Sequence, residues 1–478
     1  MRETRRLKVG LTGVMCTPFL GDKAAQFADS AERLSTLAEL LGFDLHVITG
    51  GMWNIEDARR AAAELKEWGA DFILLQTSSF GPGEFIYEFA TLDARLGIWA
   101  VPEGPPAPKG GLPLNSFTAA NMYNSIAKTF LTGYRKPVKW FYGRPGQPLF
   151  DERLSLTVKA LTALINLQGA RIGLIGGVAP GFDNLIIDER VLYERLGIRV
   201  AHIEFDEVIG RAEAQPSEPA MEASARIRRG AAIFDEGQAP ALDRAGRVLL
   251  TYRQLAEERS LDALAISCWP RFQSDYHLAV CSVLGQLNED GLIAACEGDV
   301  TSAAGMLALR YMSGNTVVTL MDLSAVDETD ESILLWHCGP TAPSLADEKG
   351  VRMQSLWLFD GYGGDGIGLH NDLVLRPGQA TVFGFTTDFD RVLVLGGRLD
   401  NSKSSYVGSR GWFCELHLND ETVTVPDLIE TLMASGYQHH YPLVYGDLSG
   451  AGLELAAWLG MRPIERRIYR PYLRPMEA

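Results

Sequence analysis

The segment AACEGDVTSAAGMLAL, residues 294–309, decides the fold more than any other stretch of the chain. The apolar run GLIAAC, residues 291–296, predicts a buried strand that leads into the Glu-Gly-Asp triplet beginning at Glu297. A helix is expected to start near Thr301. A strand followed at once by a helix is typical of parallel α/β sheets, which place their ligands at the carboxyl ends of strands.

The same rhythm of apolar runs and amphipathic stretches extends towards the N-terminus. Strands are expected at 7–12, 43–49, 71–76 and 98–102, then again at 170–175, 198–205, 261–267 and 291–295, with a long helical region over 216–260. Runs that are apolar on both faces, with helices between them, predict parallel doubly wound sheets. The rhythm restarts near residue 169, which predicts two α/β domains.

Downstream of residue 315 the texture changes to short β-rich runs separated by turn signals. Strands are expected at 316–320, 332–335, 380–386 and 391–396, and a helix at 425–435. Close spacing of short strands favours a small antiparallel barrel or sandwich. The expected domains are an α/β domain at 1–168, a second at 169–313 that carries Glu297, and a β-rich domain at 314–478.

Composition excludes several classes of partner. The net charge of −16 leaves no basic stripe for nucleic acid and gives no attraction to anionic membranes. No apolar run is long enough to span a bilayer, and the N-terminus predicts a first strand rather than a signal peptide, so we expect a cytoplasmic protein. Six scattered cysteines without a C-x-x-C pair argue against a disulfide framework and against a cysteine-based zinc site.

Strand ends also carry the residues suited to chemistry. Asp322 follows an apolar run in VVTLMDLSAVD, where it is a turn residue or a site residue; Asp299 is expected to cap the helix after Glu297. His337 stands before a Gly-Pro turn, and His439 and His440 stand before another expected strand. Two carboxylates with one or two imidazoles suit a divalent ion such as Mn²⁺ or Mg²⁺. The chain contains neither H-E-x-x-H nor a P-loop, which removes support for a zinc protease or an NTPase.

In this order and spacing, these motifs resemble the L-fucose/L-arabinose isomerase family. Glu297-Gly298-Asp299 before a helix is similar to that family's E-G-D segment, whose Glu binds metal and acts as acid/base. Asp322 matches the position of a metal-binding Asp or Glu, His337 resembles the arabinose-type ligand, and the late His-His pair resembles one in which a single histidine binds metal. The alignment favours His440, with His439 left open. Glu297, Asp322, His440, His337 and His439 are therefore the metal-site candidates.

The resemblance implies an aldose–ketose isomerase that uses Mn²⁺, with Mg²⁺ or Co²⁺ as alternatives. Glu297 and Asp322 would be its catalytic acid/base pair, and the route a cis-enediol rather than a hydride shift. It also implies a homo-oligomer, a trimer or a hexamer, with active sites between subunits. Candidates for substrate binding lie in expected strand-end loops: Gln76, Asn115, Phe182, Asp183, Trp269 and Arg271. The expected substrate is an unphosphorylated or modified sugar, including a hexose altered at C6.

Two other readings remain open from the sequence. A metal-dependent sugar epimerase or aldolase could use the same centre, and only its product would distinguish it. Two α/β domains around a cleft also describe a non-catalytic sugar-binding protein. The added β-rich domain and the missing secretory signal count against that second reading.

Overall fold

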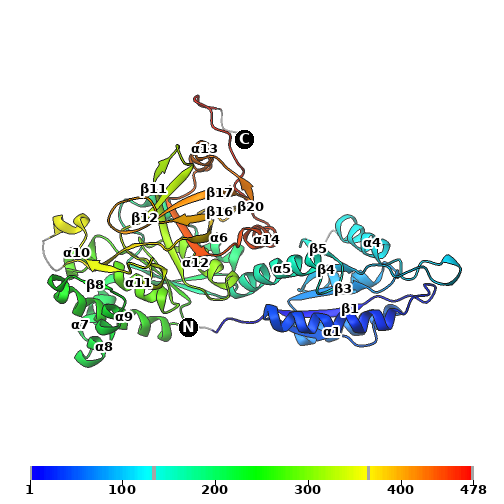
Figure 1. The fold of residues 1–478 in the computed structure, drawn as a ribbon. Coiled ribbons are helices and arrows are strands. Elements are labelled where there is room, and N and C mark those ends of the chain that lie inside the picture. Colours follow the sequence, from blue (N-terminus) through cyan, green and yellow to red (C-terminus); the bar gives the residue numbers. More distant parts are fainter. Residues whose placement is uncertain (1–2, 132–135, 363–366, 475–478) are drawn as a thin grey trace. The chain divides into compact units, whose positions relative to one another are not determined.

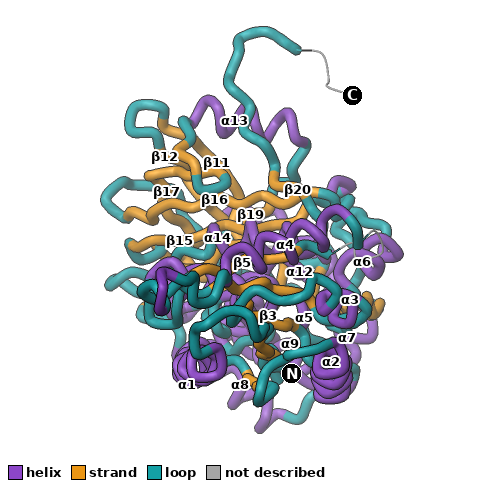
Figure 2. Tube along the Cα trace, turned by 90° about the vertical axis from the view of Figure 1, so that its right-hand side faces the viewer, coloured by secondary structure: helices purple, strands orange, loops and turns teal. Residues whose placement is uncertain are grey.

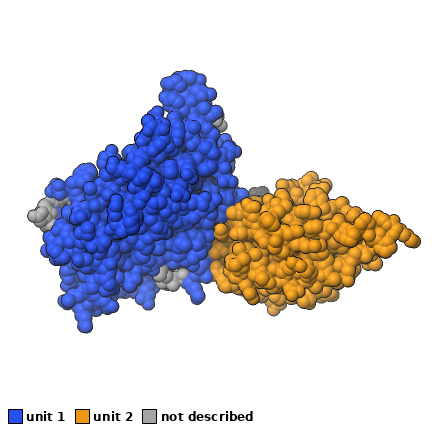
Figure 3. All heavy atoms as spheres, in the orientation of Figure 1, with its two compact units in different colours: residues 1–4, 166–478 blue, residues 5–165 orange. Residues whose placement is uncertain are grey.

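The computed structural model describes residues 3–131, 136–362 and 367–474, drawn as a ribbon in Figure 1 and as a tube in Figure 2. The chain divides into two compact units, one of residues 5–165 and the other of residues 1–4 and 166–478, coloured separately in Figure 3. The domain boundaries expected after residues 168 and 313 stay a prediction.

The unit of residues 5–165 is built on a parallel sheet in the order β2-β1-β3-β4-β5. Its strands are β1 (Lys8–Gly13), β2 (Asp44–Val47), β3 (Phe72–Thr77), β4 (Arg95–Ala100) and β5 (Val138–Tyr142). Its helices are α1 (Lys23–Leu41), α2 (Ile55–Trp68), α3 (Phe85–Ala90) and α4 (Ser116–Thr129), and α5 (Pro148–Leu167) ends just beyond it. Every residue of β3 is buried, as expected of a strand covered on both faces.

The other unit begins with a second parallel sheet, in the order β10-β9-β6-β7. The strands are β6 (Arg171–Ile175), β7 (Arg199–Ile203), β9 (Ala263–Ile266) and β10 (Ile293–Ala295). The helices are α6 (Glu189–Leu196), α7 (Phe205–Glu213), α8 (Ser217–Arg229), α9 (Ala239–Glu258), α10 (Arg271–Tyr276), α11 (Cys281–Glu289) and α12 (Val300–Met312).

The helical region expected over 216–260 is in fact two helices, α8 and α9. A short strand, β8 (Ile233–Phe234), lies between them. The break has a local cause, because Gly230 ends α8 and a proline occupies the first turn of α9.

The same unit continues into a β-rich part whose strands close into a ring. The pairs run β16-β15-β19-β11-β12-β17, and β17 pairs back with β16, all antiparallel. The strands are β11 (Val318–Asp327), β12 (Ser332–His337), β13 (Arg352–Gln354), β14 (His370–Val374), β15 (Gly378–Phe385), β16 (Arg391–Asp400), β17 (Ser409–Leu418), β18 (Glu421–Thr422), β19 (His440–Tyr445) and β20 (Arg462–Pro463), with helices α13 (Val425–Ser435) and α14 (Ser449–Leu459). Apolar side chains such as Leu335, Val382 and Leu443 form its core. Two parallel α/β sheets and a barrel-like β part confirm the predicted fold class.

Helix α12 joins the two parts of this unit. It packs on β6, β9 and β10 of the parallel sheet and on β11, β15 and β19 of the ring. Every residue of α12 except Arg310 is buried. Small residues allow α12 to pack closely on these strands. A Cβ at Gly305, for example, would lie 3.2 Å from the Phe383 carbonyl oxygen and from Pro442. None of the helices among the described residues combines the length and apolarity that crossing a bilayer requires.

Candidate active site and metal centre

The turn that follows β10 presents Glu297 in an unusual backbone conformation. Glu297 has φ 60° and Gly298 has φ 73°, so two consecutive residues are left-handed. A left-handed conformation costs a non-glycine residue about 1–2 kcal/mol, which the surrounding contacts must offset. The Ala179 amide donates to the Glu297 carbonyl at 2.9 Å, and the Gly298 amide donates to the Ile266 carbonyl at 3.0 Å. The turn is thereby held by the loop that follows β6 and by the last residue of β9.

Asp299 lies next in the chain and has two partners. One carboxylate oxygen accepts from the Ser302 amide at 2.8 Å and caps α12; the other accepts from Nδ1 of His440 at 2.8 Å. Asp299 and His440 are both fully buried. Burial raises the pKa of Asp299, but its hydrogen bond to His440 and the imidazole charge outweigh burial, so this pKa is lowered. Asp299 is both the expected helix cap and the partner of a histidine.

Asp322 and His440 face each other across the β11–β19 ladder, where they are register partners. Asp322 does not end its strand, as the sequence had indicated, because β11 continues to Asp327 through its pairing with β12. Its Oδ1 is buried and forms no hydrogen bond with the described residues, and it lies 3.7 Å from His440 Nε2. A buried carboxylate oxygen without a donor is a natural ligand for a cation.

The hydrogen bonds of His440 leave one ring nitrogen available. Its Nδ1–H donates to Asp299, and Nε2 lies 3.4 Å from Glu297 Oε2. A carboxylate that orients an imidazole in this way is common behind metal-ligating histidines. Burial opposes protonation of His440, but the Asp299 hydrogen bond and the nearby carboxylates raise its pKa to about 9.

His439 and His337 have different hydrogen-bond partners from those of His440. His439 Nε2 lies 3.0 Å from Glu297 Oε2, and the Asn184 amide donates to its Nδ1 at 3.1 Å. Burial raises the pKa of Glu297, but the His439 hydrogen bond and the histidine charges outweigh burial, so this pKa is lowered. In His337, Nδ1 accepts from the Cys338 amide at 2.7 Å, and Nε2 lies 2.9 Å from Cys296 Sγ. Burial lowers the pKa of His337, which keeps it neutral.

These donors fit a divalent metal ion. Ligand atoms of Cys296, Glu297, His337 and His440 all lie within 4.8 Å of one another, and so do those of Asp322, His439 and His440. The two groups share His440. Two carboxylates beside an oriented imidazole, with one carboxylate oxygen lacking a donor, are the chemistry such an ion requires.

The four candidate substrate-binding residues of this unit lie in different surroundings. The Phe182 ring packs on His439 with centroids 5.5 Å apart, and the neighbouring Asp183 is exposed. Trp269 follows β9 in a partly buried loop. Arg271 pairs with Asp206 at 2.6 Å and with Asp275 at 2.8 Å. The structure therefore brings Phe182 to the cluster and engages Arg271 in a surface ion-pair network.

Gln76 and Asn115 belong to the unit of residues 5–165. Gln76 is fully buried at the carboxyl end of β3; its Oε1 accepts from Ser78, and its Nε2 has no partner among the described residues. Asn115 precedes α4 in a left-handed conformation, and its side chain does not cap that helix. Their roles in binding stay predictions.

Two residues of the cluster were missed from the sequence. In the sequence, Cys296 is only one of six scattered cysteines, yet its thiol lies against His337; its position directly before Glu297 was the available signal. Asn184, which contacts His439, lies in the loop after the Gly-rich turn that follows β6 and had no distinguishing pattern.

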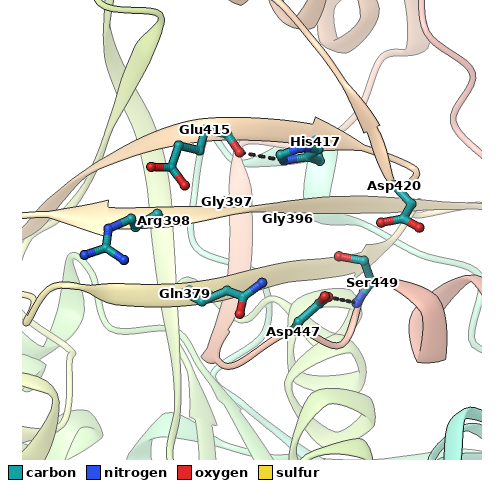
Figure 4. A pocket seen from close by; sticks show the side chains of 10 residues that line it. Gln379, Gly396, Gly397, Arg398, Glu415, His417, Asp420, Asp447 and Ser449 are labelled. Carbon is teal, nitrogen blue, oxygen red and sulfur yellow. Dashed lines mark hydrogen bonds between the residues drawn. The ribbon is translucent and has the colours of Figure 1, made fainter. Parts of the chain in front are cut away.

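A separate hollow of about 380 Å³ lies on the β15, β16 and β17 side of the ring (Figure 4). Gly396, Gly397, Arg398, Glu415 and Asp447 are among the residues that line it. It shares no lining residue with the cluster around His440.

Comparisons with known proteins agree on a class of reaction. No family model matches the chain. A sulfoquinovose isomerase from Priestia aryabhattai is 28% identical over 426 residues, which cover 87% of this chain and 89% of that protein. The sulfoquinovose isomerase from Alkalicoccus urumqiensis is 27% identical over 83% of this chain and 86% of its own length. The one from Clostridium sp. (strain MSTE9) is 25% identical over 78% and 80%.

Solved structures contribute little. A substrate-binding protein of a sugar ABC transport system from Bordetella parapertussis is 13% identical, covers 67% of this chain and 84% of its own, and has a TM-score of 0.17. A glucose-galactose binding protein from Geobacillus stearothermophilus is 15% identical, covers 66% and 93%, and has a TM-score of 0.16. Scores this low carry no argument. The curated relatives confirm the prediction of an enzyme, and the chain is an aldose–ketose isomerase.

Proposed function

We propose that this chain is a metal-dependent isomerase of a sulfonated sugar, sulfoquinovose, which it converts to the corresponding ketose. The observation that carries the proposal is the convergence of Glu297, Asp322 and His440, with His440 Nε2 lying 3.4 Å from one carboxylate and 3.7 Å from the other. The names of the relatives support the substrate, since sulfoquinovose is a glucose altered at C6. We also propose membership of the L-fucose/L-arabinose isomerase family.

Glu297 and Asp322 are proposed as the acid/base pair. The reaction moves a proton between C2 and C1 of the open-chain sugar, and a carboxylate can remove it to give a cis-enediol and return it to the neighbouring carbon. The hydrogen bond from His439 and the lowered pKa keep Glu297 ionised, as a base must be. His439, which contacts Glu297, packs its ring against Phe182.

Glu297, Asp322 and His440 are proposed as metal ligands, with His337 and His439 as further candidates. Mn²⁺ is the expected ion, with Mg²⁺ or Co²⁺ as alternatives. When bound, the ion supplies Lewis-acid stabilisation of the negative charge that develops on the sugar oxygens. Asp299 holds His440 by Nδ1 and so fixes the direction of the Nε2 lone pair.

We further propose a homo-oligomer, a trimer or a hexamer, with active sites between subunits. The unpaired Nε2 of Gln76 supports a binding role for the unit of residues 5–165. Sedimentation of the purified protein as a monomer at assay concentration would remove this part of the proposal.

The function is tested by removing bound metal with a chelator, restoring Mn²⁺ and following sulfoquinovose by NMR in D₂O. We expect a ketose to form, with solvent deuterium at the carbon that receives the proton; a hydride shift would leave no deuterium. Glu297→Gln and Asp322→Asn should each lower kcat by about 10²–10⁴, because each removes an acid/base group. Glu415→Gln is the matched control, since Glu415 is also left-handed, with φ 52°, and lines the separate hollow.

The outcomes separate the parts of the proposal. Absence of ketose from sulfoquinovose, with turnover of L-fucose, L-arabinose or glucose, would refute the substrate. Near-normal turnover by Glu297→Gln would refute the catalytic pair.

A further inference from the structure

The sulfur atom of Cys296 lies inside the proposed metal centre. Its Sγ is 2.9 Å from His337 Nε2 and 3.7 Å from His440 Nε2, and Cys296 is 2% exposed. Successive side chains of an extended strand point to opposite faces. The left-handed turn at Glu297 breaks that alternation, so the adjacent Cys296 and Glu297 both reach the cluster.

The hydrogen bonds of His337 argue against its acting as a ligand. A neutral imidazole has one N–H and one lone pair. Since the His337 Nδ1 lone pair accepts the Cys338 amide, the proton is on Nε2 and points to Cys296 Sγ. A nitrogen that carries a proton has no lone pair for a metal. His440 has the opposite arrangement: its Nδ1–H donates to Asp299, so Nε2 is the nitrogen that can bind a metal, and the metal replaces the proton there.

This inference rests on the proposed metal centre. We infer that Cys296, rather than His337, is the fourth ligand beside Glu297, Asp322 and His440. Its thiolate gives the centre a higher affinity for thiophilic ions such as Cd²⁺, Zn²⁺ and Co²⁺ than the centre would have without it. When such an ion binds, the Cys296 S–H bond breaks, a metal–sulfur bond forms, and the proton leaves to solvent. His337 Nε2–H then donates to the bound thiolate, which makes His337 a positioning residue. Thiolates select softer ions, whereas carboxylates suit Mn²⁺ and Mg²⁺.

The inference predicts a spectroscopic signature that does not depend on turnover. Metal-free protein titrated with Cd²⁺ or Co²⁺ should develop a thiolate-to-metal charge-transfer absorption in the ultraviolet, saturating at one ion per chain. Cys296→Ser should abolish this band and lower Cd²⁺ affinity about tenfold or more, while Mn²⁺ affinity stays within about threefold. Cys414→Ser, whose thiol contacts the Arg398 carbonyl instead, should keep the full band.

His337→Asn separates the two roles. If His337 only supports the thiolate, His337→Asn keeps the charge-transfer band. If His337 is a ligand and Cys296 is not, Cys296→Ser does not change the absorption spectrum of the metal-loaded protein. A wild-type protein that binds Cd²⁺ without the band, or a band that persists in Cys296→Ser, would overturn the inference. Failure of sulfoquinovose turnover with Mn²⁺ is read in a separate assay and would bear on the proposed substrate alone.

Discussion

Asp299 carries two hydrogen bonds that serve different purposes, one to the amide of Ser302 and one to His440. Changing it to asparagine keeps an oxygen for the helix cap but removes the negative charge behind the imidazole. We expect Asp299→Asn to weaken metal binding about 10–100-fold, as for other partners of metal-bound histidines. Isothermal titration with Mn²⁺ measures the change. Asp22→Asn is the control, because Asp22 caps α1 through the Ala25 amide without a histidine partner; equal losses in both variants would show that Asp299 acts only as a cap.

The turn between β10 and α12 leaves no room for a side chain at Gly298. A Cβ on Gly298 would lie 2.2 Å from the Gly177 carbonyl oxygen. We expect Gly298→Ala to lower the free energy of unfolding by about 1–3 kcal/mol and to displace Glu297, so that turnover falls as well. Gly314→Ala isolates the backbone strain, because Gly314 has a similar φ of 71° and open space around it. Denaturant unfolding of the two variants gives the comparison, and equal destabilisation would mean that the clash is relieved.

For the molecule as a whole, stability should fall in mild acid through His370. This residue is fully buried in β14, and burial lowers its pKa to about 4 from 6.5. Between these values the unfolded chain takes up a proton at His370 that the folded chain does not, so the contribution of His370 to stability is complete above pH about 6.5 and declines towards pH about 4. The loss amounts to about 3 kcal/mol.

Urea unfolding across this pH range tests the expectation. His370→Asn should flatten the pH dependence even if it lowers stability overall, and His202→Asn, which removes an exposed histidine paired with Glu189, should leave the slope unchanged. A slope that survives in His370→Asn would assign the acid sensitivity to other groups.

Much of this architecture could be predicted because local patterns and tertiary structure agree. The helix at 425–435 has the expected bounds, and each parallel strand before β10 except β5 and β8 falls on or beside an expected run. Strand β5 was missed because VKWFY at the edge of its sheet mixes exposed and buried positions without a clear period. Cys296 could not be assigned to the cluster, since its side-chain direction depends on the left-handed turn at Glu297. Asp322 and His440 become neighbours only through the β11–β19 register, which acts over more than a hundred residues of sequence.

The position of α12 between two sheets has a consequence for the integrity of the enzyme. The proposed catalytic donors come from both sides of this one helix: Glu297 from the parallel sheet before it, Asp322 and His440 from the ring after it. Neither sheet holds a complete set of donors. A chain severed in the short link after Met312 would leave one fragment with one carboxylate and the other with a carboxylate and an imidazole. Each fragment would then have to find its complement before any ion could be held between them.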